Sequence, residues 1–279
     1  MIVKGCIFDL GGTIVDRYSF TPLLCLQRAF KGQRINIPLS MIRKDMGLSK
    51  EDHIHKLLEE KEVQKQWINK YRQRPTKADR LSLFSDFQFM QERETKLNMK
   101  VLPHTAKCIS RLKKDNIVTG VTTGFDSEQM DRIKWLLESE NIFLDSYVSS
   151  TCLDKPARPE PHMIFENMKR LNLDDPRRII KIDDTVSGIQ EGLNAGCWTV
   201  AVCRWSSNMN VDSVKDMDIL DNFNADNNYT ENYYQLRERI NKCRQIMASS
   251  GAHYVINTLY ELQNVIDDIN DIRTPIPKN

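Results

Sequence analysis

This 279-residue sequence lacks an excess of charge of either sign. Its 40 Lys and Arg residues nearly balance its 38 Asp and Glu residues, which leaves a net charge of +2. A balanced chain with scattered basic residues gives no electrostatic case for nucleic-acid binding. The sequence also lacks any apolar run near the roughly 18 residues that span a bilayer, and residues 1–10 lack a secretory signal pattern. We therefore expect a cytoplasmic protein without nucleic-acid or membrane partners.

The seven cysteines are odd in number and form no CxxC pair. Closely spaced cysteine pairs are typical of structural zinc sites and redox motifs, so their absence argues against both. Several of the cysteines stand inside apolar runs, as small buried side chains do. We expect reduced, buried thiols in a protein whose 40% hydrophobic and 28% charged residues are ordinary for a globular chain.

Short apolar runs alternate with helical patterns along much of the chain. The apolar runs that read as buried parallel strands are residues 2–8, 117–121, 179–182 and 198–202. Helical periodicity is found at residues 106–114, 127–139 and 161–171. This alternation predicts an α/β fold with a doubly wound, Rossmann-like parallel sheet.

Residues 18–99 break the alternation, because they are rich in Lys, Glu and Gln and contain no convincing strand. We expect a helical cap domain at 18–99, inserted into a core domain formed by residues 1–17 and 100–279. Its predicted helices are 22–30, 38–46, 50–62 and 77–98. After residue 203 we expect a polar stretch of surface loop and short helix to about residue 228. A helix at 231–249 with Thr230 as a possible N-cap, a strand at 252–256 and a helix at 261–272 should follow.

The first apolar run leads into Asp9, which is followed closely by Gly11 and Gly12. A carboxylate at the end of a buried strand can approach phosphorus when the following backbone carries no bulk, because loop amides can then close around the anion. The same pattern also occurs in many ordinary turns. Asp9 is therefore a candidate nucleophile and Gly12 a candidate phosphate-binding residue.

Three further segments at predicted strand ends carry groups that suit phosphate chemistry. Thr123 and Gly124 can hold a phosphoryl oxygen through a hydroxyl and backbone amides, although a simple helix cap has the same pattern. Arg158 lies in a loop between prolines and suits charge stabilisation, although a solvated loop arginine is commoner. Asp183 and Asp184 repel one another unless a cation or hydrogen bonds offset the repulsion, which makes Mg²⁺ a natural partner.

In this order the four segments resemble the four motifs of the haloacid dehalogenase superfamily. The resemblance implies that Asp9 forms an aspartyl-phosphate, that Thr123 and Arg158 bind phosphate, and that the late acids hold Mg²⁺ with Asp9. Many phosphatases of the superfamily carry a general acid two residues after the nucleophile, and such an acid contributes about 10²–10⁴-fold. Here that position is Gly11, so either phosphatase activity is weak or the leaving group needs no proton there.

Lys50 offers an explanation for the missing acid. It follows the segment Met46-Gly47-Leu48-Ser49 and opens a predicted helix on which it shares a face with His53. A lysine buried under a cap can lose its proton and condense with an aldehyde, and a neighbouring histidine can move protons. Spacing alone fits a solvated lysine and a surface histidine equally well.

The segment that ends in Lys50 resembles the discriminating motif of the phosphonoacetaldehyde hydrolase (phosphonatase) family. Similar segments extend over most of the chain, at residues 8–13, 20–23, 46–50, 52–53, 122–124, 157–159, 184–187, 192–200 and 251–253. The resemblance implies that Lys50 forms an imine with phosphonoacetaldehyde, that Asp9 attacks phosphorus, and that the C–P bond breaks to give an enamine. No oxygen leaves in that step, so a small residue at position 11 is appropriate.

The same resemblance implies substrate contacts from Met46 and His53, and Mg²⁺ held by Asp9, Asp184 and the Gly11 carbonyl, with Asp183 beside them. It also implies a homodimer formed through the caps. The sequence hints at such an interface only through apolar positions of an early cap helix, which would equally suit the cap's own core. These positions are Leu23, Leu24, Leu26 and Phe30.

Some features depart from the family pattern. Leu10 and Gly11 stand where the family usually has Trp and Ala, and Phe125 stands where it often has Tyr. The usual Gly-Asp-Thr with a further Asp four residues on is replaced by Asp183-Asp184 and then Gly188, and the polar stretch before residue 230 is longer. A phosphatase of altered specificity and a non-catalytic phosphate-binding protein therefore stay as alternatives.

Overall fold

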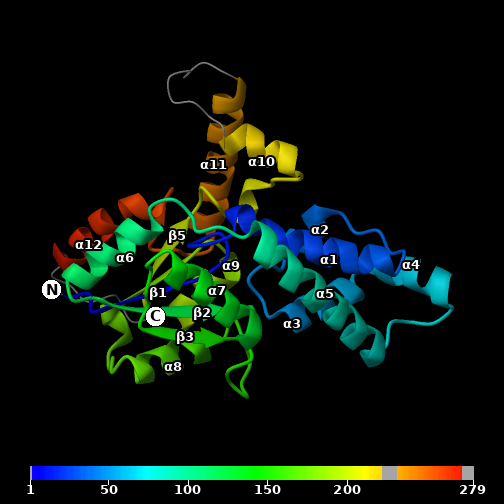
Figure 1. The fold of residues 1–279 in the computed structure, drawn as a ribbon, viewed down its shortest axis with the longest axis horizontal. Coiled ribbons are helices and arrows are strands. Elements are labelled where there is room, and N and C mark those ends of the chain that lie inside the picture. The colour runs from blue at the N-terminus through cyan, green and yellow to red at the C-terminus, as the bar shows by residue number, and fades with distance from the viewer. Residues whose placement is uncertain (1, 222–230, 272–279) are drawn as a thin grey trace.

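The computed structural model describes residues 2–221 and 231–271 of the chain (Figure 1). Within them, parallel strands form one sheet in the order β3-β2-β1-β4-β5-β6. The strands are β1 (Gly5–Phe8), β2 (Val118–Thr123), β3 (Ser146–Ser149), β4 (Ile179–Asp183), β5 (Trp198–Val202) and β6 (Tyr254–Ile256). This is a doubly wound order, so the predicted α/β fold with a Rossmann-like parallel sheet is confirmed.

Helices cover both faces of the sheet, because successive strand residues point to opposite sides. In β1, Cys6 and Phe8 belong to one hydrophobic cluster and Ile7 to another. The first face is covered by α6 (Thr105–Lys114), α7 (Ser127–Ser139) and α12 (Leu262–Asp271), and the second by α8 (His162–Arg170), α9 (Val186–Asn194) and α11 (Glu231–Ser249). Burial of both faces explains why the strands read as continuous apolar runs.

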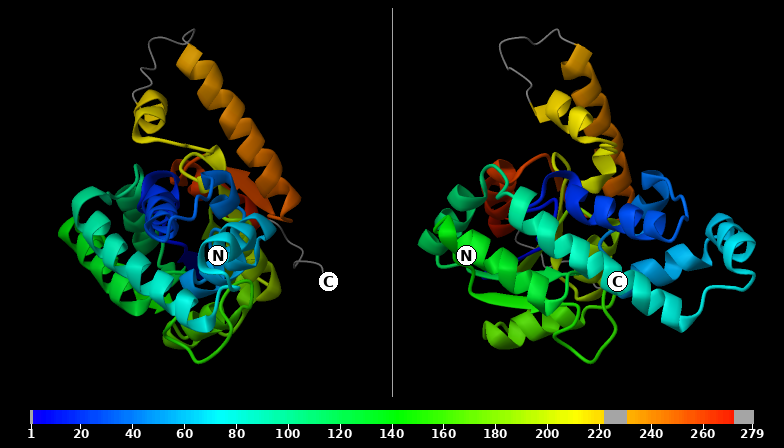
Figure 2. Two further views of the ribbon diagram at one scale, coloured as in Figure 1. Left: turned by 90° about the vertical axis from the view of Figure 1, so that its right-hand side faces the viewer. Right: turned by 45° about the vertical axis from the view of Figure 1, so that its right-hand side comes forward.

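A helical body lies to one side of the sheet, between β1 and β2 in the chain (Figures 1 and 2). It consists of α1 (Phe20–Gly32), α2 (Leu39–Arg43), α3 (Lys50–Glu59), α4 (Lys61–Tyr71) and α5 (Lys77–Asn98). A separate hydrophobic cluster fills it and includes Leu23, Leu26 and Phe30. These three side chains are thus part of the cap's own core, and Leu24 is half-buried against a cluster of the sheet side.

Two elements differ from the expectation. β3 is unpredicted because its sequence, Ser-Tyr-Val-Ser, forms no apolar run. The helix expected at 50–62 is two helices, because Glu60 takes an extended conformation (φ −61°, ψ 128°) between α3 and α4. Thr230, the expected N-cap of α11, and Ile272, the expected end of the last helix, lie outside the described residues.

The connections contain short 3-10 turns at Arg17–Ser19, Pro176–Arg178, Ser207–Met209 and Leu259–Glu261, and the helix α10 (Val214–Asp221). Figure 2 shows the N-terminal part of α11 projecting away from the sheet, with α10 beside it, while the C-terminal part of α11 packs against the sheet. Among the described helices, none combines the length and the apolar character needed to cross a membrane. All seven cysteines are free thiols, and five of them are buried.

Candidate active site

The carboxyl ends of the three central strands bring the predicted phosphate-chemistry residues together. β1 pairs with β2 on one side and with β4 on the other. Asp9 directly follows β1, Thr123 ends β2, and Asp183 and Asp184 stand at the end of β4. All four are buried, with at most 6% of their surface exposed. Parallel strands of a doubly wound sheet present their carboxyl ends to a ligand in this way.

Arg158 reaches this edge from its loop and is held there by several groups at once. Its Nη1 forms an ion pair with Oδ1 of Asp9 at 2.9 Å. Its Nε donates to Oε2 of Glu191 at 2.9 Å, and its Nη2 donates to the carbonyl of Thr122 at 2.6 Å. The side chain is buried, and these contacts fix the guanidinium beside the candidate nucleophile.

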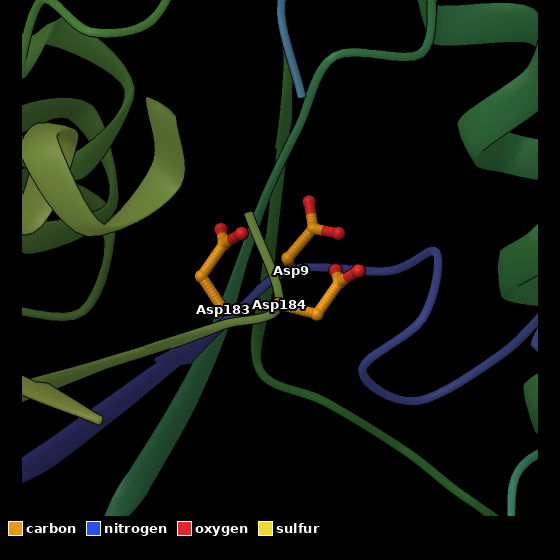
Figure 3. Close-up of side chains that lie close together, drawn as sticks. All are labelled: Asp9, Asp183 and Asp184. Carbon is orange, nitrogen blue, oxygen red and sulfur yellow. The ribbon is translucent and has the colours of Figure 1, made fainter. Parts of the chain in front are cut away.

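Asp9, Asp183 and Asp184 form a carboxylate cluster in which one oxygen from each lies within 4.8 Å of the others (Figure 3). Burial, followed by the charges of Asp9 and Asp183, raises the pKa of Asp184 well above its ordinary value. Burial and the charge of Asp183 raise the pKa of Asp9 to about 6. Among the described residues, the carboxylate of Asp184 accepts two long hydrogen bonds, from Thr13 Oγ1 at 3.4 Å and Ser207 N at 3.3 Å. Such crowded carboxylate oxygens fit a hard divalent cation such as Mg²⁺.

Asp183 differs from the other two acids because both of its oxygens already have partners. Oδ1 accepts from the backbone N of Thr185 at 2.9 Å and from its Oγ1 at 2.7 Å. Oδ2 forms ion pairs with Nζ of Lys181 at 2.9 Å and Nη1 of Arg158 at 3.3 Å. Burial raises the pKa of Asp183, but the two cations outweigh it and hold the pKa below its ordinary value. Asp9 and Asp184 are therefore better candidates than Asp183 for ligands of a bound cation.

Lys50 enters the same site from the cap. Ser49 caps α3 by accepting from the backbone N of Asp52, so Lys50 is the first residue of the helix. Its side chain is buried, and burial lowers its pKa to about 8. The ring of Phe125 lies 6.0 Å from Nζ. The alternative of a solvated lysine is wrong.

A narrow cavity of about 20 Å³ joins the cap residues to the core residues. It is lined by Asp9, Gly11, Ser19, Pro22, Met46, Gly47, Lys50, Thr123, Gly124, Phe125, Arg158 and Thr185. Most of the predicted site residues thus surround one space, which has room for about one water molecule. The cap is closed over the nucleophile in this structure.

Four predicted site residues do not line this cavity, namely Asp183 and Asp184 of the carboxylate cluster, His53 and Gly12. His53 is fully buried, and its Nε2 is 2.8 Å from the carbonyl of Ile42, whereas its Nδ1 has no hydrogen-bond partner among the described residues. Burial and the charge of Lys50 lower the pKa of His53 well below its ordinary value, so the ring is neutral. Gly12 has φ 74°, and a β-carbon there would lie 2.3 Å from Oδ2 of Asp184. Gly12 therefore lets the carboxylate approach the loop.

Sequence reasoning missed several residues that shape this site, among them Ser19, Lys181 and Glu191. Lys181 is a single charge inside the apolar strand Ile-Ile-Lys-Ile-Asp, and this isolated charge is a signal that could have revealed it. Ser19 reaches the cavity wall because its backbone is left-handed (φ 47°). No pattern in the sequence marks that conformation.

A model of the haloacid dehalogenase-like hydrolase family matches residues 6–202, a span that holds the cluster, Arg158 and Lys50. The chain belongs to the haloacid dehalogenase-like hydrolases. Within this family it is similar to the phosphonoacetaldehyde hydrolase of Bacteroides fragilis, with 32% identity over 268 residues covering 96% of this chain and 97% of that one. The enzyme of the same name from Bacillus cytotoxicus is 33% identical over 279 residues, with the same coverage.

Solved structures of this family have a similar fold. A phosphonoacetaldehyde hydrolase-like protein from Oleispira antarctica superposes with a TM-score of 0.87 and 26% identity, covering 97% of this chain and 93% of that one. A predicted phosphoglycolate phosphatase from Haemophilus somnus has a TM-score of 0.66 and 13% identity, which shows a shared fold alone. The resemblance to the haloacid dehalogenase superfamily and to its phosphonoacetaldehyde hydrolases, expected from the motifs, is thus confirmed.

Proposed function

We propose that this hydrolase cleaves the C–P bond of phosphonoacetaldehyde to give acetaldehyde and phosphate. The names of the similar proteins from Bacteroides fragilis and Bacillus cytotoxicus support this substrate. The observation that carries the proposal is that Lys50 of the cap and Asp9 of the core line one closed cavity. A phosphatase needs only the carboxylate, whereas cleavage next to an aldehyde makes use of both groups.

The amine of Lys50 is suited to condense with an aldehyde. Its pKa falls from the ordinary 10.5 to about 8 because the side chain is buried. At pH 7 such a shift increases the neutral, nucleophilic fraction roughly 300-fold. The ring of Phe125 lies beside the amine, and the charge of Asp9 offsets part of the effect of burial on the pKa.

In the proposed reaction the neutral amine of Lys50 adds to the aldehyde and loses water to form a protonated imine. The carboxylate of Asp9 attacks phosphorus, the C–P bond breaks, and its electron pair moves into the imine to give an enamine. Protonation of the enamine carbon and hydrolysis of the imine release acetaldehyde and free Lys50. Water then attacks the aspartyl-phosphate, which releases phosphate and restores Asp9.

Positions near the nucleophile fit a reaction without a protonated leaving oxygen. A β-carbon at Gly11 would lie 3.4 Å from Oγ of Ser19 and 3.7 Å from Cζ of Phe125. Both are ordinary contact distances, so the general acid of many phosphatases is absent here because residue 11 is glycine, not because space is lacking. A reaction whose leaving group needs no proton at this place accounts for that absence, which favours the C–P hydrolase over a phosphatase of altered specificity.

His53 and Met46 take supporting roles in the proposal. The neutral ring of His53 offers Nδ1 as a proton acceptor close enough to Lys50 for the ammonium charge to lower its pKa. We assign it the proton transfers of imine formation and hydrolysis. Met46 lines the cavity and provides an apolar wall against the bound substrate. Thr123, Gly124 and Arg158 are assigned to the phosphoryl oxygens.

Mg²⁺ fits the residues at the strand ends, and we propose that Asp9, Asp184 and the Gly11 carbonyl hold it. Bound Mg²⁺ would supply positive charge that offsets repulsion between Asp9 and an approaching phosphoryl group. Asp183 stands beside these ligands and acts on Arg158 and Lys181 through its ion pairs.

We also propose a cytoplasmic homodimer that associates through cap domains formed by residues 18–99. Two apolar side chains of α5, Leu81 and Phe89, are 47% and 76% exposed and support a contact on this side. Light scattering should give a mass of twice 32.5 kDa. A Phe89→Ser variant should weaken the interface and therefore dissociate at a higher protein concentration than the wild type, and a monomeric wild type would overturn the proposed dimer.

The function is tested with purified protein, Mg²⁺ and phosphonoacetaldehyde, following acetaldehyde and phosphate. Lys50→Arg keeps the positive charge but cannot form an imine, so it should release neither product. Lys56→Arg makes the same change on an exposed lysine of the same helix and should match the wild type. Borohydride should trap a reduced adduct at Lys50 in the wild type. No turnover by the wild type, or equal turnover by Lys50→Arg, would refute the function.

A further inference from the structure

The cap loop that precedes Lys50 lies between two loops of the core. Its backbone is close enough to contact both of them. A β-carbon on Gly47 would lie 2.3 Å from Oγ of Ser187 and 2.4 Å from Oγ1 of Thr185. On the opposite side, a β-carbon on Gly124 would lie 2.5 Å from the carbonyl oxygen of Leu48. Glycine on each side permits this approach. The cap loop is therefore seated against the core through its main chain.

One side-chain hydrogen bond crosses this seam beside the glycines. Oγ of Ser187, in the first turn of α9, donates to the carbonyl of Met46 at 3.2 Å. The acceptor belongs to the turn that leads into α3 and Lys50. The cleft along the seam has a volume of about 230 Å³ and is lined by Met46, Thr185 and Ser187 among others.

The same serine connects the cap to the charged network of the core. Oγ of Ser187 lies 3.3 Å from Oγ1 of Thr185, which donates to Oδ1 of Asp183 at 2.7 Å. Oδ2 of Asp183 is paired with Lys181 and Arg158. A contiguous set of polar contacts thus extends from the carbonyl of Met46 to the guanidinium beside the nucleophile.

The number of hydroxyl protons determines which group donates in each of these hydrogen bonds. Each hydroxyl has a single proton, so while Thr185 donates to Asp183, Ser187 has its own proton free for the carbonyl of Met46. If the cap moves away, Ser187 can turn its proton toward Oγ1 of Thr185 instead. The hydroxyl then keeps an acceptor in both states. Because Ser187 has an acceptor in both states, its bond to Met46 favours the closed cap by no more than about one net hydrogen bond.

We propose that Ser187 is a positioning residue that holds the cap loop against the core and thereby places Lys50 in the cavity. Its hydroxyl donates to the carbonyl of Met46 when the cap is closed, and to Oγ1 of Thr185 when the cap is open. Ser187 itself touches neither the reacting atoms nor the cavity. The role in placing Lys50 rests on the proposed function, whereas the contact between loop and core does not.

Hydrogen–deuterium exchange of the free, full-length protein tests the contact without any substrate. The amides of Met46 and Leu48 donate within their own loop at 3.3 and 3.4 Å, so their exchange reports its opening. In Ser187→Ala, exchange across residues 44–50 should be about fivefold faster, while exchange in α1 stays unchanged. Ser82→Ala makes the same change at an exposed helical position and should leave both regions as in the wild type. Equal exchange of residues 44–50 in Ser187→Ala and the wild type would overturn the proposal.

Kinetics with phosphonoacetaldehyde separate positioning from chemistry. Saturating substrate favours the closed cap, so kcat of Ser187→Ala should stay within about twofold of the wild type and kcat/KM should fall by no more than about fivefold. A large loss of kcat with unchanged exchange would make Ser187 a direct participant and contradict the positioning role. If the wild type releases no acetaldehyde, the proposed function fails, and the exchange comparison still decides the role of Ser187.

Discussion

A β-carbon on Gly188 would lie only 1.9 Å from Oδ2 of Asp183. The two positions share one space, which the carboxylate of Asp183 occupies because residue 188 has no side chain. The usual family pattern has glycine at the first position and an acid at the second, so the two departures are reciprocal. In this chain the carboxylate in that space enters from β4 and pairs with Lys181 and Arg158.

Gly188→Ala should destabilise the fold, because the new methyl group must displace the Asp183 carboxylate from its two cations. We expect a loss of about 1–3 kcal/mol in the free energy of unfolding, measured by urea denaturation. Gly32→Ala is the matched control, because a β-carbon there meets no atom within 4 Å. Adding Asp183→Gly to Gly188→Ala should cost less than the sum of the single changes. Strict additivity would show that the two positions do not share space.

Imine formation at Lys50 should depend on pH through its lowered pKa. The neutral amine is the reactive form, so trapping with acetaldehyde and cyanoborohydride should rise about tenfold per pH unit below 8. It should level off above about 8, because burial lowers the pKa of Lys50 to about that value. Mass spectrometry of the modified peptide measures the rate. A rate that still climbs tenfold between pH 9 and 10 would contradict the lowered pKa.

Arg158→Lys should lower kcat by about 10²-fold or more. A lysine cannot reproduce the fork that contacts Asp9, Glu191 and Thr122 together. Phosphate release under saturating substrate measures the effect. Arg170→Lys, at an exposed arginine of α8 paired with Glu166, should leave kcat unchanged. Activity of Arg158→Lys within threefold of the wild type would remove Arg158 from the phosphoryl-binding role.

Mg²⁺ should raise the melting temperature of the wild type, because binding relieves repulsion among buried carboxylates. The stabilisation expected at a concentration 100 times Kd is about 2.7 kcal/mol. Asp184→Asn should abolish this shift, and without Mg²⁺ it should melt no lower than the wild type, since the neutral amide removes one repelling charge. Asp154→Asn, at an exposed position, should keep the full shift. A wild type that Mg²⁺ does not stabilise would argue against this site.

The sheet and the location of its functional edge follow from local signals in the sequence. β1, β4 and β5 are buried on both faces and therefore appear as apolar runs, and Asp9 and Asp184 directly follow two of them. β3 is only four residues long and half of them are serine, so its place in the sheet depends on pairing with β2 and not on its own composition.

The burial of Lys50 and His53 lies beyond what spacing can predict. Their positions on α3 show only that they share a face, whereas the core decides whether that face meets water. Phe125, Arg158 and Thr123, which line the cavity with Lys50, come from segments that are distant from Lys50 in the chain. Lys181 and Glu191 are likewise paired only by the packing of α9 on β4. Tertiary contact therefore determines the electrostatics of the site.

The enclosure of Lys50 by both cap and core has a consequence for chemical selectivity inside a cell. When the cap opens, the amine meets solvent and returns to an ordinary ammonium ion, which is a poor partner for stray aldehydes. The burial that lowers the pKa of Lys50 requires the cap to lie against the core residues Arg158 and Asp9. An aldehyde without a phosphorus group, such as acetaldehyde, can still react with Lys50, but it gains nothing from Arg158 and should therefore form its adduct more slowly than phosphonoacetaldehyde does.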